Sequence, residues 1–241
     1  MNRFGLIGKN IAYSFSAKFF TEKFKIENIQ NQYYEIFDLN EISEVEKTFK
    51  VDGLKGCNVT IPYKEQIIPF LDELDADAEK IGAVNCIKIQ NGIKKGYNTD
   101  AVGFEKSIQS LLNSNHKNAL ILGDGGAAKA VKFVLEKLNI PFKTVTRSGN
   151  FTYSDLNSEI IQNHQIIINC TPVGTFPNIE EVPEIPYEFL TSQHLLYDLI
   201  YNPEKTKFLQ LGEEKGVKIK NGYEMLVLQA EKSWEIWNQP L

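Results

Sequence analysis

The chain has 241 residues, of which 42% are hydrophobic and 24% are charged, and its formal net charge is −5 at pH 7. These proportions are typical of globular proteins and exclude a disordered or low-complexity chain. The negative balance argues against nucleic acid as a partner, because binding it requires a basic face that neutralises phosphates. At about 150 residues per domain, the length predicts one large domain or two small ones.

The sequence carries no membrane-spanning, secretory or metal-binding pattern. No apolar run approaches the roughly 20 residues of a membrane helix, and residues 2–8 do not form the charged and then apolar segments of a signal peptide. The three cysteines, Cys57, Cys86 and Cys170, form no CxxC pair, and the three histidines form no HExxH or HxH pattern. We therefore expect a cytoplasmic protein with no membrane association, no disulfide framework and no protein-bound metal.

The first hundred residues alternate short apolar runs with segments of helical periodicity. The runs predict strands at residues 4–7, 33–37 and 57–61, and the periodicity predicts helices after Ser16, at residues 42–49 and at residues 62–74. Pro62 suits the first turn of the last of these helices, because its missing N–H has no partner there in any case. Two further strands, residues 86–89 and 93–97, flank Asn91-Gly92, which predicts a hairpin because both residues tolerate positive φ.

The second half repeats a strand–helix pattern more regularly. Strands are predicted at residues 119–122, 142–145, 166–169, 195–200 and 217–220, with helices at residues 127–138 and 208–215. This alternation indicates a doubly wound α/β sheet. A last amphipathic helix is predicted over residues 223–237. The boundary between the two halves is expected in the helix after Asp100.

A glycine loop joins the strand at residues 119–122 to the following helix. Gly123, Gly125 and Ala128 fit the pattern G-x-G-x-x-G/A in the strand–turn–helix context of a dinucleotide site. The glycines permit a tight turn and close backbone approach, and the helix N-terminus offers free N–H groups to a pyrophosphate. The alternative is a glycine-rich turn without a ligand. Asp124 is unfavourable beside a phosphate unless it points into solvent.

The residues after the next strand bear on which dinucleotide is bound. An NAD site places an Asp or Glu there, which accepts a hydrogen bond from the ribose 2′-OH. Here the strand ends in Thr146, Arg147 and Ser148, and a guanidinium with two hydroxyls suits a 2′-phosphate. The sequence therefore favours NADP, although Arg147 could instead be an ordinary surface residue.

Two segments of the first half carry polar residues that suit a small anionic substrate. Ser14 and Ser16 alternate, so in an extended segment both hydroxyls face one way and can donate to a carboxylate. The alternative is a helix N-cap, which is favoured for Ser16 taken alone. Lys64 falls in the first turn of a predicted helix, where the dipole disfavours the ammonium form and so favours proton transfer. A lysine that extends into solvent is an equal alternative.

Further polar residues stand beside segments that otherwise look buried. Asn85 and Asp100 are two of them, and Asp100 has a strong alternative as a helix N-cap. Gln229 interrupts the apolar residues of the last helix, so it faces either solvent or a binding site.

Taken together, these segments resemble the shikimate dehydrogenase family over nearly the whole chain. The resemblance rests on Ser-x-Ser at 14–16, Asn-Val-Thr-x-Pro-x-Lys at 58–64, Gly-Ala-Val-Asn at 82–85, Asn-Thr-Asp at 98–100, the glycine loop at 123–128 and Glu-Met-Leu-x-x-Gln-Ala at 224–230. Several of these motifs are weak alone, but their common order is specific.

The resemblance implies an α/β fold of two domains and a reaction. A substrate-binding domain spans residues 1–101, with a C-terminal helix of residues 222–241 packing back on it, and a doubly wound Rossmann domain for NADP spans residues 102–221. The implied activity is the reversible, NADPH-dependent reduction of 3-dehydroshikimate to shikimate, in aromatic amino-acid and chorismate biosynthesis. A monomer or a homodimer is expected.

The resemblance also implies roles for individual residues. Lys64 and Asp100 match the catalytic pair, in which Lys64 is the proton donor. The residues matching the substrate site are Ser14, Ser16, Thr60, Asn85, Asp100, Tyr201 and Gln229. The residues matching the cofactor site are Gly123, Gly125, Gly126, Ala127, Thr146, Arg147, Ser148, Leu199 and Gly222.

One departure from the family pattern leaves two alternatives open. The family often has a second arginine shortly after the one matched by Arg147, whereas this chain continues Gly149-Asn150-Phe151. An NAD-using quinate/shikimate dehydrogenase is therefore the first alternative. The second is a non-catalytic, nucleotide-sensing binding protein, since one fold hosts many functions; the presence of both Lys64 and Asp100 argues against it.

Overall fold

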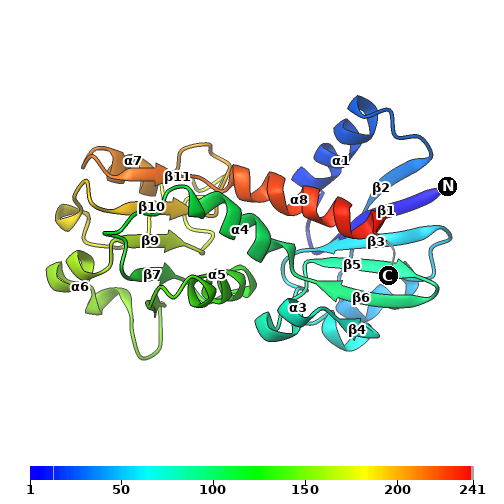
Figure 1. The fold of residues 1–241 in the computed structure, drawn as a ribbon, viewed down its shortest axis with the longest axis horizontal. Coiled ribbons are helices and arrows are strands. Elements are labelled where there is room, and N and C mark those ends of the chain that lie inside the picture. The colour runs from blue at the N-terminus through cyan, green and yellow to red at the C-terminus, as the bar shows by residue number, and fades with distance from the viewer. Residues whose placement is uncertain (13, 240–241) are drawn as a thin grey trace. The chain divides into compact units, whose positions relative to one another are not determined.

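The computed structural model describes residues 1–12 and 14–239, and the chain forms two compact units (Figure 1). The first unit comprises Met1–Val102 together with Gln229–Leu241, and the second comprises Gly103–Leu228. Both divisions between the units fall inside helices, namely α4 (Thr99–Gln109) and α8 (Tyr223–Asn238).

The first unit is built on a six-stranded mixed sheet with the order β2-β1-β3-β5-β6-β4. Its strands are β1 (Asn2–Gly8), β2 (Gln32–Asp38), β3 (Leu54–Val59), β4 (Glu73–Leu74), β5 (Cys86–Gln90) and β6 (Ile93–Tyr97). β1 is parallel to β2 and β3, whereas β5 is antiparallel to β3 and β6. Its shorter elements are α1 (Phe15–Ile26), η1 (Ile42–Glu44), α2 (Val45–Thr48), η2 (Ile68–Phe70) and α3 (Ala76–Ile81).

The predicted hairpin between β5 and β6 is confirmed. Gln90 pairs with Ile93, so Asn91 and Gly92 form a two-residue turn, with φ angles of 53° and 82°. Positive φ at both positions is the requirement of the turn type that matches strand twist, which is why the Asn-Gly pair predicts it.

The predicted helix over residues 62–74 is wrong. Residues 61–67 form turns, η2 follows, and the segment ends in β4. Pro69 explains the difference, because in a helix interior its ring removes one backbone donor and clashes with the preceding turn. The apolar spacing that suggested a helix comes instead from packing on the core: Tyr63 and Ile67 are buried there.

Two clusters of buried side chains stabilise the first unit. One contains Ile7, Val59 and Ile67. The other brings the end of α8 onto the sheet, where the ring of Trp237 stacks on Phe4 at 4.7 Å and its Nε1 donates to the carbonyl of Ile87. Residues from the end of the chain therefore complete the core of the unit that contains its beginning.

The second unit is a five-stranded, all-parallel sheet with the order β11-β10-β9-β7-β8. Its strands are β7 (Ala119–Leu122), β8 (Phe142–Val145), β9 (Ile166–Asn169), β10 (Leu195–Asp198) and β11 (Lys218–Lys220). Its remaining helices are α5 (Gly126–Lys137), η3 (Tyr153–Asp155), α6 (Ser158–Asn163), η4 (Tyr187–Phe189) and α7 (Lys207–Glu213). Renumbered within the unit the order is 2-1-3-4-5, a doubly wound order in which the winding reverses between β7 and β9. The predicted fold class is confirmed.

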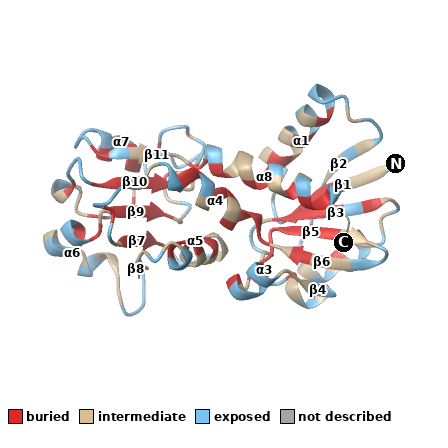
Figure 2. Ribbon diagram, viewed as in Figure 1, coloured by how far each residue is buried: buried red, intermediate tan, exposed pale blue. Residues whose placement is uncertain are grey.

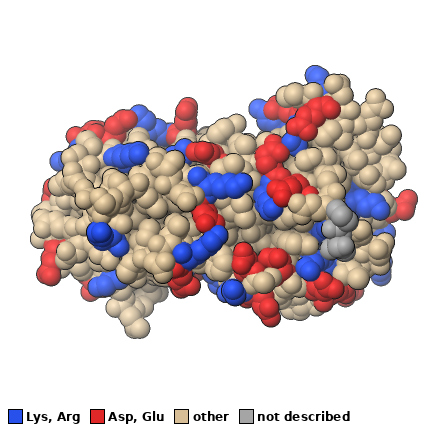
Figure 3. Space-filling model, in the orientation of Figure 1, with Lys and Arg blue, Asp and Glu red and all other residues tan. Residues whose placement is uncertain are grey.

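The central strands β7, β9 and β10 are buried along their whole length (Figure 2). Apart from Asn169 and Asp198 at the ends of β9 and β10, their sequences are apolar runs, as expected of parallel strands covered on both faces. No helix within the described part of the chain is both long and apolar enough to cross a membrane. On the face shown in Figure 3, lysines and acidic residues are interspersed rather than gathered into one basic surface.

Candidate active site

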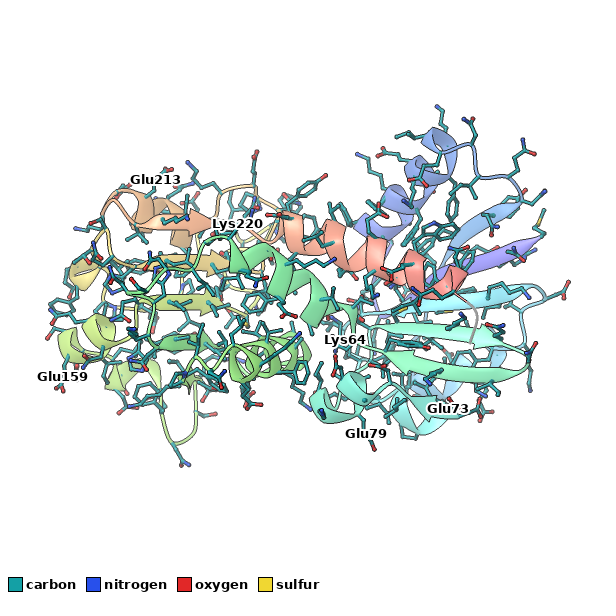
Figure 4. The ribbon with its side chains drawn as sticks, viewed as in Figure 1. Lys64, Glu73, Glu79, Glu159, Glu213 and Lys220 are labelled. Carbon is teal, nitrogen blue, oxygen red and sulfur yellow. The ribbon has the colours of Figure 1, made fainter. Side chains whose placement is uncertain are left out.

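Lys64 and Asp100 form a nearly buried ion pair in the first unit. Lys64 lies in the turns after β3 and is labelled in Figure 4, and Asp100 lies in the first turn of α4. Lys64 Nζ is 2.6 Å from Asp100 Oδ2, and the two side chains are 14% and 9% exposed. The backbone of Lys64 is also fixed, because its carbonyl accepts from the N–H of Val84. The pair therefore has a defined geometry.

The structure excludes the alternative roles considered for Lys64 and Asp100. Asn98 Oδ1 accepts from the N–H of Ala101, so Asn98 caps α4 and Asp100 does not. The argument from a helix dipole at Lys64 is wrong, because residues 61–67 are turns. The ion pair also excludes the reading in which Lys64 simply extends into water.

A cluster of buried amide and hydroxyl groups lies in the same unit. Asn85 Oδ1 accepts from the backbone N–H of Thr99 at 2.6 Å, and this unambiguous donor fixes the orientation of the amide. Asn85 Nδ2 then donates to Thr99 Oγ1 at 3.0 Å and to Gln229 Oε1 at 3.4 Å. The structure thus brings together Asn85 and Gln229, which are 144 residues apart.

Thr99 belongs to this cluster and was not among the residues predicted to form the site. It is fully buried, and its hydroxyl lies 3.3 Å from Gln229 Oε1 and 3.2 Å from Ser233 Oγ. The sequence feature that points to Thr99 is its position between Asn98 and Asp100 in the Asn-Thr-Asp motif.

The two serines do not share one extended segment as expected. Ser14 is the N-cap of α1, and its Oγ accepts from the N–H of Ser16. Ser16 lies inside α1, where it is buried against the hydroxyl of Tyr34. The capping role expected for Ser16 is therefore taken by Ser14. Thr60 follows β3, and its N–H donates to the carbonyl of Ile7 at the end of β1.

The glycine loop of the second unit has the geometry that a phosphate site requires. Gly123 has a φ of 96°, which favours glycine, and a Cβ there would lie 2.8 Å from the side chain of Thr171. Gly125 is the N-cap of α5, and open space surrounds the position that its Cβ would take. Gly126 and Ala127 begin the helix, so their N–H groups belong to its unbonded first turn.

Asp124 does not oppose a phosphate at this loop. Its carboxylate pairs with the Nζ of Lys132, two turns along α5, and the side chain is 52% exposed. The unfavourable charge noted in the sequence is therefore directed into solvent and offset by a lysine.

The residues expected at the 2′-phosphate follow β8. The hydroxyl of Thr146 donates to the carbonyl of Ser148 at 2.7 Å, which closes a tight turn around Arg147. Arg147 and Ser148 are exposed. The guanidinium is thus available to an anion at the carboxyl edge of the sheet.

Leu199 and Gly222 lie against one another beyond β10. A Cβ on Gly222 would lie 2.1 Å from the carbonyl oxygen of Leu199, so only glycine fits. The N–H of Gly222 donates to the carbonyl of Ile200. Tyr201 follows directly and is 38% exposed, and partial burial raises the pKa of its phenol.

The residues present fit a dinucleotide. The open backbone at Gly125 and the N-terminus of α5 suit a pyrophosphate, Arg147 suits a 2′-phosphate, and Gly222 permits close approach to the backbone of Leu199. Within the described residues, no group of three or more His, Cys, Asp or Glu side chains could hold a metal ion.

A doubly wound sheet with this glycine loop, in a chain that also holds a buried lysine–carboxylate pair, defines a dinucleotide-dependent oxidoreductase of two units. The family model described as the shikimate dehydrogenase substrate binding domain matches residues 6–87. The chain belongs to the shikimate dehydrogenase family.

Relatives cover almost the whole chain. The NADP(+) shikimate dehydrogenase of Methanosphaera stadtmanae is 36% identical over 97% of this chain and 90% of its own length. A crystal structure of shikimate dehydrogenase in complex with NADP+ is 34% identical, with a TM-score of 0.88, and the match covers 99% of this chain and 90% of that one. The enzyme of Thermus thermophilus, solved with NADP(H) and shikimate, is 27% identical, with a TM-score of 0.87 and coverage of 100% and 95%.

Proposed function

We propose that this protein is an NADP-dependent shikimate dehydrogenase, which catalyses the reversible reduction of 3-dehydroshikimate to shikimate in aromatic amino-acid and chorismate biosynthesis. The observation that carries the proposal is the Lys64–Asp100 pair, held at 2.6 Å in a nearly buried position in the unit that contains the amide cluster. Such a pair has the chemistry of a proton donor with its orienting base.

In this proposal Lys64 gives a proton to the C3 oxygen of the substrate and takes it back in the reverse direction. Bound NADPH supplies the hydride to C3. Asp100 accepts a hydrogen bond from Lys64 Nζ, which keeps the ammonium group in one place and compensates its charge. The carboxylate also offers its second oxygen to a substrate hydroxyl.

Residues of the first unit bind the substrate. Ser14 and Ser16 bind its carboxylate, and Thr60, Asn85 and Gln229 bind its ring hydroxyls. Burial of Asn85 and Gln229 supports this role, because fixed amides in a dry site discriminate strongly between ligands that do and do not hydrogen-bond. The substrate domain comprises residues 1–101 and the C-terminal segment 222–241, within which α8 spans Tyr223–Asn238.

The NADP-binding domain comprises residues 102–221. Gly123, Gly125, Gly126 and Ala127 hold the pyrophosphate, and Leu199, together with Gly222 directly after this range, lines the nicotinamide pocket. Thr146, Arg147 and Ser148 bind the 2′-phosphate, for which the exposed guanidinium and the absence of a carboxylate in the turn 146–148 are the support. The enzyme acts in the cytoplasm as a monomer or a homodimer.

The test is a steady-state assay of the purified protein with shikimate or quinate and with NADP+ or NAD+. The proposal requires shikimate-dependent reduction of NADP+ with the highest kcat/KM of the four combinations. A preference for NAD+ would instead establish the quinate/shikimate alternative. A solved quinate dehydrogenase in complex with NAD shares the fold at only 21% identity, so it gives that alternative no further weight. NADP+ binding without turnover would indicate a sensor.

A further inference from the structure

Asp198, at the end of β10, is a fully buried carboxylate that the proposed reaction does not use. Its Oδ2 accepts from the hydroxyl of Thr206 at 2.6 Å. Its Oδ1 accepts from Asn169 Nδ2 at 3.1 Å and from the N–H of Ile200 at 3.0 Å. Burial raises its pKa to about 6, and the hydrogen bonds from Thr206, Ile200 and Asn169 oppose this shift because they stabilise the charged form.

The three donors come from three different segments of the carboxyl edge of the sheet. Asn169 ends β9, Ile200 lies in the loop after β10, and Thr206 is the N-cap of α7. A carboxylate accepts from all three at once because both of its oxygens are acceptors, whereas an amide has only one. Asp198 therefore ties these segments together.

Asn169 connects the Asp198 carboxylate with two residues assigned to the cofactor. Asn169 Oδ1 accepts from the N–H and the hydroxyl of Thr171, and the Thr171 methyl group packs against Gly123 of the glycine loop. The carbonyl of Asn169 accepts from the N–H of Leu199, the residue that contacts Gly222. The groups expected at the pyrophosphate and at the nicotinamide thus share one support.

We infer that Asp198, Asn169 and Thr206 are positioning residues that hold Gly123 and Leu199 in register for the pyrophosphate–nicotinamide half of the dinucleotide. This inference rests on the proposed function. Thr146, Arg147 and Ser148 follow β8 and make no hydrogen bond with this group in the described structure, so the adenosine 2′-phosphate half binds independently of it.

The difference between the two halves provides the test. Thr206→Val removes the hydroxyl that donates to Asp198 and leaves the buried carboxylate short of a partner. Binding of NADP+ and of adenosine 2′-monophosphate, which lacks the 5′-phosphate that the glycine loop would hold, is measured by calorimetry on the full chain. We expect NADP+ to bind about tenfold more weakly, the effect of an unsatisfied buried group, and the monophosphate to bind within about twofold of wild type. Thr206→Ser retains the hydroxyl and restores NADP+ binding.

Two control variants separate positioning from general loss of stability. Asn157→Ala removes the N-cap of α6, as Thr206→Val removes that of α7. Tyr197→Phe removes a buried hydroxyl from the residue before Asp198. That hydroxyl is hydrogen-bonded to Ser107 and not to Asp198. Neither control changes NADP+ binding if the inference is correct.

Three outcomes overturn the inference: unchanged NADP+ binding in Thr206→Val, equal weakening of both ligands, or the same weakening in either control. If Thr206→Val does not fold, Asp198→Asn, which has nearly the same shape but one acceptor fewer, must show the same selective loss. If the wild-type protein binds neither ligand, the proposed function itself fails, which is a different result from any of these.

Discussion

Asn98 and Asp100 divide two tasks at the start of α4: Asn98 caps the helix through the N–H of Ala101, and Asp100 reaches Lys64 Nζ at 2.6 Å. Because the capping requirement is met two residues earlier, the carboxylate of Asp100 is not occupied by the helix. The short sequence from Asn98 to Asp100 also includes Thr99, whose N–H orients the amide of Asn85. One helix start therefore places groups at both the ion pair and the amide cluster.

Replacing Lys64 tests the proton-transfer role. We expect Lys64→Ala to lower kcat by about 10²–10⁴-fold at saturating substrate, because this is the usual contribution of a positioned acid or base. Lys80→Ala, at an exposed lysine of α3, is the matched control and should retain full activity. Steady-state kinetics in both directions measure the effect, and a Lys64→Ala variant with wild-type kcat would exclude the assignment.

Arg147 is expected to determine cofactor preference. Arg147→Ala removes a charge-assisted contact with the 2′-phosphate, so the ratio of kcat/KM for NADP+ to that for NAD+ should fall by about 10–100-fold. Lys137→Ala, at an exposed lysine of the same unit that pairs with Glu105, should leave this ratio unchanged. The idea does not survive if both variants keep the wild-type ratio.

Gly56 is predicted to tolerate no side chain. A Cβ at this position would lie 2.3 Å from Trp237 Nε1 and 2.8 Å from the carbonyl oxygen of Ile87, the two partners of one hydrogen bond. Gly56→Ala should therefore lower the free energy of unfolding by about 1–3 kcal/mol, the usual cost of overpacking. Lys55→Ala, at the neighbouring exposed position of β3, is the control. Urea unfolding followed by tryptophan fluorescence compares them, and equal midpoints would contradict the prediction.

Asp198 predicts a pH dependence of stability with a definite sign. Burial raises its pKa from 3.8 to about 6 in the folded protein, so between these values the folded state binds more protons than the unfolded state. The contribution of Asp198 to stability therefore falls as pH rises from about 4 to about 6 and is constant above that range. Asp198→Asn removes this component. The free energy of unfolding of wild type minus that of the variant should be lower at neutral pH than near pH 4. A difference independent of pH would refute it.

Local patterns were sufficient to predict much of the fold. The strands at residues 119–122, 142–145 and 166–169 have the predicted bounds. Two of them are short apolar runs bounded by turn residues, which is the pattern of central strands in a parallel sheet. The helix predicted at residues 62–74 does not form because Pro69 lies inside it, and Tyr63 and Ile67 instead pack on the core from successive turns.

The geometry of the candidate site could be predicted from the sequence only in part. Lys64 and Asp100 are 36 residues apart, and no local pattern specifies that their side chains meet. The family resemblance predicted both residues as catalytic, whereas their short separation and their burial are known only from the tertiary structure. Thr99 was overlooked because a threonine at a helix start has an ordinary explanation, and Asp198 because nothing in its neighbours shows that three segments converge on it.

Trp237 and its neighbours on α8 complete the first unit although the whole second unit precedes them in the chain. During synthesis, residues 103–228 emerge as one continuous stretch and can fold while the first unit still lacks its final helix. Until Trp237 leaves the ribosome, the apolar side chains of Phe4, Phe20 and Phe24 lack their covering partner. A fragment ending near residue 102 would lack this covering partner and would expose the apolar surface of Phe4, Phe20 and Phe24 to aggregation.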